Sequence, residues 1–209
     1  NGVKYEVDIR DGRRPDFSWI RNITVLHPEA LQGGEGSGLL YTYRLFCLNA
    51  GIAGAQSVLG VDASETAVLQ ARRNASLNGL DGTVKFLCED VFELLPELEE
   101  KGEKFDVVVL DPPAFTKSRS SVKNAIKGYR EINLRAMRLV KDGGFLQPVP
   151  APFHDTELLA KTVKEAAKAA HKRLRQVEFR TQAPDHPILW ANSANVPESY
   201  YLKFYIFRL

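Results

Sequence analysis

The sequence predicts an α/β protein built on a doubly wound, mostly parallel sheet. Short apolar runs alternate along the chain with longer stretches of helical period, which is the pattern of successive βαβ units. The most apolar run, residues 105–110, is nearly continuous in β-branched residues, as expected of a strand buried on both faces of a parallel sheet. A length of 209 residues suits one such domain with a small appendage.

The predicted elements follow one another from residue 57 onward. The clearest helix has Ser64 as its N-cap, Glu65 in its first turn and Gly79 after its last turn. The final two strands are interpreted as an antiparallel edge hairpin, and residues 1–20 as an N-terminal hairpin arm before a domain of residues 21–209. The predicted strands are 57–62, 84–88, 105–110, 145–149, 175–181 and 200–208, and the predicted helices are 64–78, 91–101, 128–141 and 155–171.

Composition sets further bounds on the class of protein. Hydrophobic residues make up 44% and charged residues 26%, which is ordinary for a globular protein, and a net charge of +2 does not by itself indicate a nucleic-acid partner. No apolar run approaches the ~20 residues that cross a bilayer, and no signal peptide is recognisable, so a cytoplasmic location without a membrane partner is expected. Cys47 and Cys88 are interpreted as two buried free thiols, and no metal site is predicted.

Acidic residues stand at the ends of two predicted strands. Ligands of an open parallel sheet bind beyond the carboxyl ends of its strands, where a carboxylate can accept hydrogen bonds from both hydroxyls of a ribose. Asp62 is placed for that role, and Asp90 for binding an adenine amine, with Val91 or Phe92 packed on the ring. Helix capping is the alternative interpretation of both Asp62 and Asp90.

The sharpest motif is Asp111-Pro112-Pro113-Ala114-Phe115, which directly follows the most apolar strand. Two prolines fix φ and remove two N–H donors, so the chain can neither continue the ladder nor begin a helix there. The motif therefore predicts a stiff loop at a strand tip. Asp111 and nearby carbonyls would hold the amino-bearing edge of a planar base, and Phe115 would stack on it.

A basic stretch follows this loop. Only Glu131 opposes its cations before Asp142, and two aromatic residues, Phe115 and Tyr129, are interleaved with them. Such residues neutralise phosphates and supply much of the affinity for nucleic acids, so the stretch is interpreted as an RNA-binding surface. A solvated helix face is the alternative. The RNA-binding candidates are Lys117, Arg119, Lys123, Lys127 and Arg130, and the stretch continues through Arg135, Arg138 and Lys141.

These motifs together resemble the class I methyltransferases of the rRNA large-subunit methyltransferase I type. The resemblance runs from about residue 56 to the end of the chain. It implies a Rossmann-like, seven-stranded sheet, S-adenosyl-L-methionine as the cofactor, and methyl transfer to a base of 23S ribosomal RNA. It also implies that an upstream PUA-type RNA-binding domain is missing here, and it leaves a homodimer open. The segments that carry it are 58–64, 71–79, 90–92, 105–115, 128–133, 143–146, 185–187 and 201–203.

The resemblance also assigns roles at the site. Asp62, Ala63, Asp90, Val91, Asp111 and Phe46 are the expected cofactor contacts, and Asp111, Pro112, Pro113 and Phe115 form the expected catalytic loop.

Three segments depart from the family pattern. Tyr43-Arg44-Leu45-Phe46 stands where the family has a glycine turn against the cofactor, and a side chain there is expected to crowd the cofactor. Residues 16–22 lack the family's Asp-Gln-Arg, and Pro150-Ala151-Pro152 replaces a Ser-Cys-Ser stretch.

These departures leave the activity open in two ways. Without a cysteine near residue 151, covalent attack on cytosine is excluded and direct transfer to a base nitrogen is favoured. A catalytically degenerate RNA-binding module is the alternative to an enzyme. A nicotinamide-dependent oxidoreductase is disfavoured, because no Gly-x-Gly-x-x-Gly follows a strand.

Overall fold

The structure is a computed structural model, and it describes residues 37–41, 44–110, 122–148, 156–181 and 204–209. Helices and strands alternate along this part of the chain, as the sequence predicts. In order they are β1 (Ser37–Tyr41), α3 (Arg44–Ile52), β2 (Ser57–Asp62), α4 (Glu65–Leu77), β3 (Val84–Cys88), α5 (Val91–Glu100), β4 (Phe105–Val109), α6 (Val122–Leu139), β5 (Val140–Gln147), α7 (Thr156–Ala169), β6 (Arg175–Arg180) and β7 (Phe204–Arg208).

The strands of the described residues form one seven-stranded sheet in the order β3-β2-β1-β4-β5-β7-β6. Neighbouring strands from β3 to β5 are parallel, whereas β7 is antiparallel to both β5 and β6. The predicted α/β class is therefore confirmed, with a mixed sheet at its centre. Strand order reverses between β1 and β4, which makes this the topological switch point, where open α/β sheets bind their ligands.

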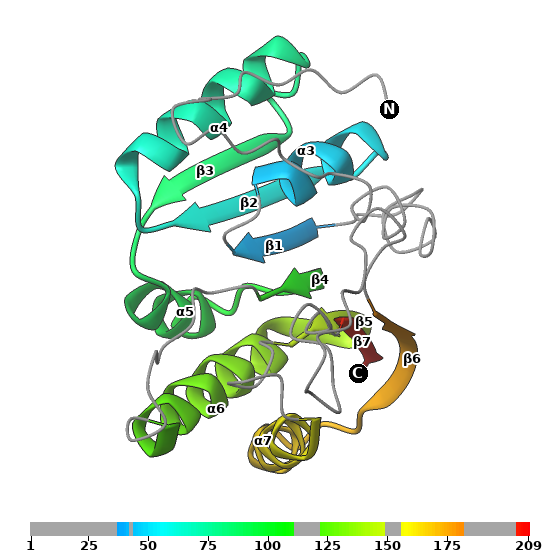
Figure 1. The fold of residues 1–209 in the computed structure, drawn as a ribbon. Helices are drawn as coiled ribbons and strands as arrows, with labels where there is room; N and C mark the ends of the chain where they lie inside the picture. The colour runs from blue at the N-terminus through cyan, green and yellow to red at the C-terminus, as the bar shows by residue number, and fades with distance from the viewer. Residues whose placement is uncertain (1–36, 42–43, 111–121, 149–155, 182–203) are drawn as a thin grey trace, which may run out of the picture.

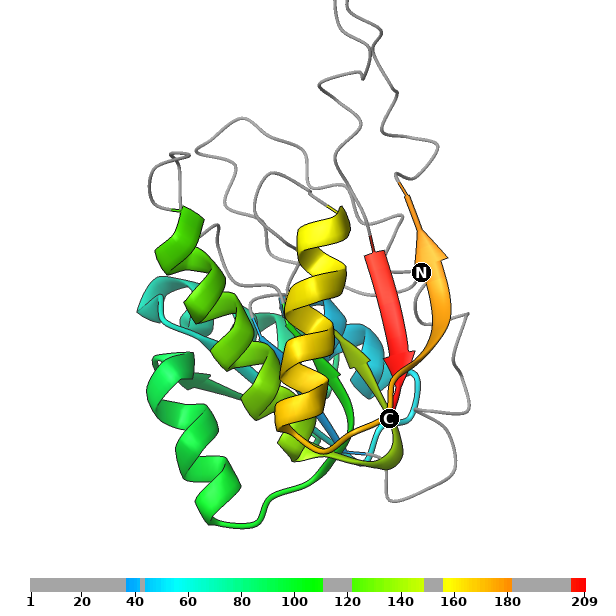
Figure 2. The same ribbon diagram turned by 90° about the horizontal axis from the view of Figure 1, so that it is seen from below.

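Helices cover both faces of the sheet. Figure 1 shows α3 and α4 on one face and α5, α6 and α7 on the other, and the view from below in Figure 2 shows the second group side by side. Each face has its own apolar core: Phe86 packs with α3 and α4, and Leu95 and Ile132 pack under α5 and α6. Both faces of the central strands are thus largely buried, which explains why their sequences are mostly apolar.

Strand β2 shows how the sequence serves both cores. Val58 lies in the core under α3 and α4, and Val61 lies in the core on the other face, as the alternation of side chains along a strand requires. Gly60 faces Phe86 and Cys47, and a Cβ at this position would lie 2.5 Å from the Phe86 ring. Glycine is therefore needed here for packing, because any side chain would overlap the core.

The ends of α4 match the sequence prediction closely. Ser64 is the N-cap, and its hydroxyl accepts a hydrogen bond from the Ala67 amide at 3.3 Å. Glu65 lies in the first turn, and Gly79 follows the helix with a φ of +67°, a conformation that glycine adopts without strain.

Other boundaries differ from the prediction. The sequence analysis predicts neither β1 nor α3 as a separate element, although β1 is an interior strand of the sheet, paired with β2 and β4. Helix α6 begins at Val122 rather than residue 128, and β5 begins at Val140 rather than residue 145. The sequence predicts that the preceding helix ends at Gly143-Gly144. In the structure β5 continues through this segment, and its pairing with β4 changes register there. The predicted arm of residues 1–20 lies outside the described residues.

Candidate functional site

The carboxyl ends of β3, β2, β1 and β4 lie along one edge of the sheet, because these four neighbours are parallel. Asp62 is the last residue of β2, and its strand partner is Cys88, the last residue of β3. Asp90 follows two residues later, before α5. The two acidic residues singled out in the sequence therefore follow adjacent strands at the same edge.

Asp62 is half-buried and is held by its own backbone. Its Oδ1 accepts a hydrogen bond from the Ser64 amide at 2.9 Å, an Asx-turn that fixes the carboxylate at the strand tip. Within the described part of the chain, Oδ2 has no hydrogen-bond partner. A carboxylate can accept about four hydrogen bonds, so Asp62 keeps capacity for a ligand.

Asp90 repeats this arrangement on the neighbouring strand. It is exposed, and its Oδ1 accepts a hydrogen bond from the Phe92 amide at 2.8 Å, which makes it the N-cap of α5. Its other oxygen is uncommitted among the residues that the structure describes. Capping and ligand binding are therefore compatible here, since each uses a different oxygen of one carboxylate.

The two strand tips are also joined to each other. The Glu89 amide donates to the Asp62 carbonyl at 3.3 Å, and the Cys88 thiol lies 3.6 Å from the Ala63 carbonyl. Cys88 is exposed, so the prediction of two buried thiols is wrong for this residue, which lies at the tip of its strand. Cys47 is buried as predicted, and its burial raises the pKa of the thiol far above the ordinary value.

Two other expected cofactor contacts lie in the core. Phe46 on α3 is 6% exposed and Val91 on α5 is 3% exposed. Phe92, next to Asp90, is 44% exposed and is the large apolar side chain available at this tip. Ala63 is exposed beside Asp62.

The segment that replaces the family's glycine turn begins helix α3. Arg44 and Leu45 have helical backbone, and among the described residues His171 alone combines a side chain with positive φ. Their backbone therefore needs no glycine, whereas Tyr43 lies outside the described residues. The expected loop of Asp111, Pro112, Pro113 and Phe115, and the basic residues Lys117 and Arg119, lie outside them too.

The basic stretch of α6 divides into residues that face solvent and residues that are neutralised. Lys127 and Arg130 are exposed, with Arg130 also 3.8 Å from Glu165 of α7, and nothing is described of the Lys123 side chain. Tyr129, which is interleaved with these cations in the sequence, is 4% exposed and packs in the core, so it does not contribute to a basic surface. Three of the remaining cations, Arg135, Arg138 and Lys141, bind carboxylates.

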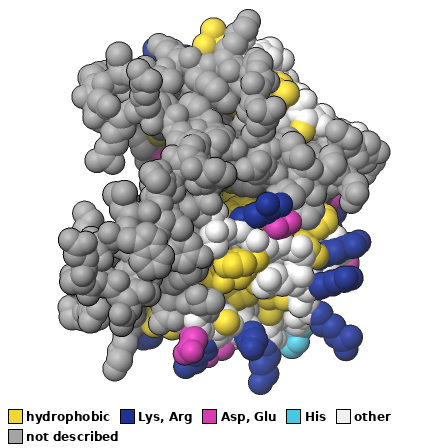
Figure 3. Space-filling model, turned by 45° about the vertical axis from the view of Figure 1, so that its right-hand side comes forward, with side chains coloured by type: hydrophobic (Ala, Val, Ile, Leu, Met, Phe, Trp, Pro, Cys, Tyr) yellow, Lys and Arg dark blue, Asp and Glu magenta, His cyan; other side chains and the backbone are white. Residues whose placement is uncertain are grey.

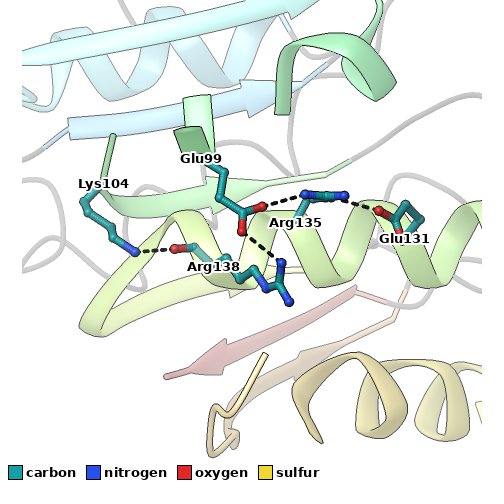
Figure 4. Close-up of polar contacts among 5 residues, drawn as sticks. All are labelled: Glu99, Lys104, Glu131, Arg135 and Arg138. Carbon is teal, nitrogen blue, oxygen red and sulfur yellow. Dashed lines mark hydrogen bonds and ion pairs between the residues drawn. The ribbon is translucent and has the colours of Figure 1, made fainter. Parts of the chain in front are cut away.

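Most of these carboxylates come from outside the stretch. Glu99 of α5 accepts from Arg135 and from Arg138, each at 2.9 Å, and Arg135 also contacts Glu131 at 2.8 Å (Figure 4). Lys141 binds Asp106 of β4 at 3.0 Å. The sequence could not reveal Glu99 and Asp106 as partners, because they lie more than 30 residues away, and the pairs of Glu99 join α5 to α6.

Replacing Glu99 with glutamine is expected to lower the free energy of unfolding by about 1 kcal/mol near neutral pH, because a charged acceptor of two arginines is lost at a partly exposed site. Burial acts to raise the pKa of Glu99, but the hydrogen bonds from Arg135 and Arg138 outweigh it and lower that pKa. The stabilisation is therefore full above the unfolded pKa of about 4.3 and is lost as pH falls through the lower folded value. Urea unfolding of wild type and E99Q across this range measures the difference. A difference that persists unchanged in acid would contradict the ion-pair account.

No group of three or more His, Cys, Asp or Glu side chains in the described residues could hold a metal ion. Among their helices, none combines the length and the apolar character needed to cross a membrane.

Comparison with known proteins places the chain in a family. A family model described as a methyltransferase domain matches residues 36–196, which is most of the chain, and the chain therefore belongs to the methyltransferase domain family. The ribosomal RNA large subunit methyltransferase I of Aeromonas salmonicida is 38% identical over 100% of this chain and 52% of its own length. The chain thus spans about half the length of the curated relatives it matches.

Solved structures agree on the fold. A protein from Streptococcus mutans superposes with a TM-score of 0.70 at 18% identity, covering 95% of this chain and 50% of its own. The O-methyltransferase from Bacillus cereus in complex with SAH superposes with a TM-score of 0.59 at 13% identity, covering 94% of this chain and 82% of its own.

Proposed function

We propose that this chain is the catalytic domain of an S-adenosyl-L-methionine-dependent enzyme that methylates a base of 23S ribosomal RNA. One observation carries the proposal: Asp62 and Asp90 follow adjacent parallel strands, and each offers an uncommitted carboxylate oxygen at the ligand-binding edge. The match of this chain to about half of a ribosomal RNA methyltransferase supports the reaction and the substrate.

The residues present fit an adenosyl group. Asp62 would accept hydrogen bonds from both ribose hydroxyls through its uncommitted oxygen, with the small Ala63 leaving room beside it. Asp90 would accept the adenine amine, and the exposed ring of Phe92 would pack on the base. Phe46 and Val91 are buried, so their part is to support these residues from the core.

The target base would be held by Asp111, Pro112 and Pro113, with Phe115 stacked on it, as the sequence motif predicts. When bound, the cofactor supplies an electrophilic methyl group on a sulfonium. The protein's task is then to hold the base nitrogen in line with that methyl group and to exclude water. Because neither cysteine follows β5, direct transfer to a nitrogen is favoured over a covalent cysteine route.

The arrangement of the sheet supports the finer assignment as a Rossmann-like class I methyltransferase. Strand order β3-β2-β1-β4-β5-β7-β6, with β7 antiparallel, agrees with the implied seven-stranded sheet and edge hairpin. We assign residues 21–209 to this domain and residues 1–20 to an arm. Cytoplasmic location, absence of a metal and self-association as a homodimer remain predictions. The proposed RNA contacts are Lys117, Arg119, Lys123, Lys127 and Arg130.

Transfer of radiolabelled methyl from S-adenosylmethionine to unmodified 23S ribosomal RNA tests the function. Label retained in the RNA after nuclease mapping to one position is the expected result. Cofactor binding without transfer would reject the activity of this chain. RNA binding without cofactor binding would instead favour the degenerate RNA-binding module.

The two cysteines provide a test of where the cofactor lies. Cys88 is exposed beside Ala63 and Asp62, so a thiol reagent such as DTNB is expected to modify it in the folded protein, whereas buried Cys47 reacts only on unfolding. Saturating SAH should slow modification of Cys88 several-fold, with the reaction of DTNB with free cysteine, which SAH does not affect, as the control. A Cys88 rate that SAH leaves unchanged would contradict the proposed position of the adenosyl group.

A further inference from the structure

A second basic surface lies on α7, outside the stretch that the sequence singled out. Lys161, Lys164 and Lys168 are spaced i, i+3 and i+7, so they share one side of the helix, and all three are exposed. Arg173 and Arg175 are exposed just beyond the helix, at the start of β6. These five residues are called the α7 basic face. Figure 3 shows Lys and Arg side chains gathered toward the lower right of the described surface, with few acidic side chains among them.

The five cations are not neutralised by the residues that the structure describes. None of them forms an ion pair or hydrogen bond through its side chain with another residue in the described segments. Three nearby acids pair with other cations: Glu165 contacts Arg130 of α6 at 3.8 Å, Glu178 binds Arg180 at 2.9 Å, and Asp142 binds Lys172. The positive charge of the α7 basic face is therefore available to a partner.

The path of α7 relates this face to the proposed site. Strand β5 ends at the edge where Asp62 and Asp90 lie, and α7 is the connection from β5 to β6. Because β6 is antiparallel to β7, and β7 to β5, strand β6 runs parallel to β5 and α7 must cross back to the opposite edge. Lys161 therefore lies toward the site, and Arg175 lies at the far edge of the sheet.

A row of fixed cations leading away from a site suits an extended polyanion. Along a helix the three lysines are spaced by about 4.5 and 6 Å, a close succession of positive charges. All five residues are lysines or arginines, whose positive charge attracts phosphates whatever the base sequence, which favours contact with the RNA backbone.

We propose that the α7 basic face binds the phosphate backbone of the RNA that flanks the target base. This inference rests on the proposed function. Binding of the flanking backbone would hold the RNA while one base is splayed out toward the strand edge, which is how enzymes gain access to a base.

The test compares two variants that each remove two positive charges. K164Q/K168Q alters the α7 basic face, and the control K85Q/K101Q alters exposed lysines on β3, at the other end of the sheet, and after α5. Binding of a fluorescein-labelled, mixed-sequence RNA is measured by fluorescence anisotropy over a range of KCl concentrations. Thermal unfolding of both variants checks that they are folded.

K164Q/K168Q is expected to bind RNA on the order of 10-fold more weakly at low salt, and the slope of log K against log salt should fall by about 1.4. The control should keep the wild-type slope, with at most about a twofold change from long-range screening. Equal slopes for the two variants would overturn the inference.

The remaining outcomes separate the inference from the proposed function. If wild type methylates RNA and both variants bind RNA equally well, the proposed role of the α7 basic face is overturned, and the proposed function stands. Failure of wild type to bind RNA at any salt concentration overturns both. Lysine-dependent binding to phosphatidylglycerol vesicles, without RNA binding, would assign the face to a membrane surface and also overturn the inference.

Discussion

D62A is expected to weaken binding of S-adenosylmethionine by on the order of 100-fold, measured by isothermal titration calorimetry. Asp62 stands at the tip of β2 with Oδ1 fixed by the Ser64 amide and Oδ2 uncommitted. Two ribose hydroxyls would donate to this carboxylate, and a hydrogen bond to a charged group contributes about 1.5–3 kcal/mol. Loss of both hydrogen bonds is expected to cost about 3 kcal/mol of binding free energy, which raises Kd by roughly two powers of ten.

The matched control is D81A, in the turn between α4 and β3. Asp81 is exposed and, like Asp62, accepts one local hydrogen bond through its carboxylate, here from Ser76, but it precedes β3 and so lies at the opposite edge of the sheet. D81A should bind the cofactor like wild type. If D62A also bound like wild type, the ribose contact would be elsewhere and the site as described would be wrong.

G60A is expected to lower the free energy of unfolding by about 3 kcal/mol, the largest effect on stability that we predict for a single methyl group. A Cβ at Gly60 would lie 2.5 Å from the Phe86 ring and 2.8 Å from the Cys47 sulfur, all within the core under α3 and α4. Overpacking of this kind typically costs 1–3 kcal/mol because neighbouring side chains or strands must move. Urea unfolding followed by circular dichroism measures the change.

Two further variants make this result specific. Gly82 has nothing within 4 Å of its Cβ position and no positive φ, so G82A should change stability by less than about 1 kcal/mol. F86L opens space next to residue 60, and G60A/F86L should therefore be more stable than the sum of the single changes predicts. Strict additivity would show that the contact with Phe86 is not the cause.

Local signals predicted much of this fold. The cap at Ser64, the glycine after α4 and the apolar run of β4 each act within a few residues, so the sequence contains all the information needed for them. Strand β1 was not predictable in that way. Its five residues, Ser-Gly-Leu-Leu-Tyr, follow a glycine-rich stretch and have little strand propensity, and pairing with β2 and β4 on both sides compensates for this.

The candidate site also combines features that local sequence predicts with features that depend on how distant segments pack. Asp62 and Asp90 were predictable because each directly follows an apolar strand, and the order of strands brings them to one edge. The burial of Tyr129 and the pairing of Arg135 with Glu99 depend on how α6 packs against α5, which a single stretch of sequence does not encode. The basic stretch therefore offers fewer free cations than its composition indicates, whereas α7 offers three that composition did not emphasise.

A crystal structure of the chain with SAH tests the central claim most directly. Our account predicts density for the ligand at the carboxyl edge of β2 and β3, with the ribose hydroxyls on the Asp62 carboxylate and the adenine amine on Asp90. Ligand density at any other edge or face of the sheet, with these two carboxylates left in solvent, would contradict it.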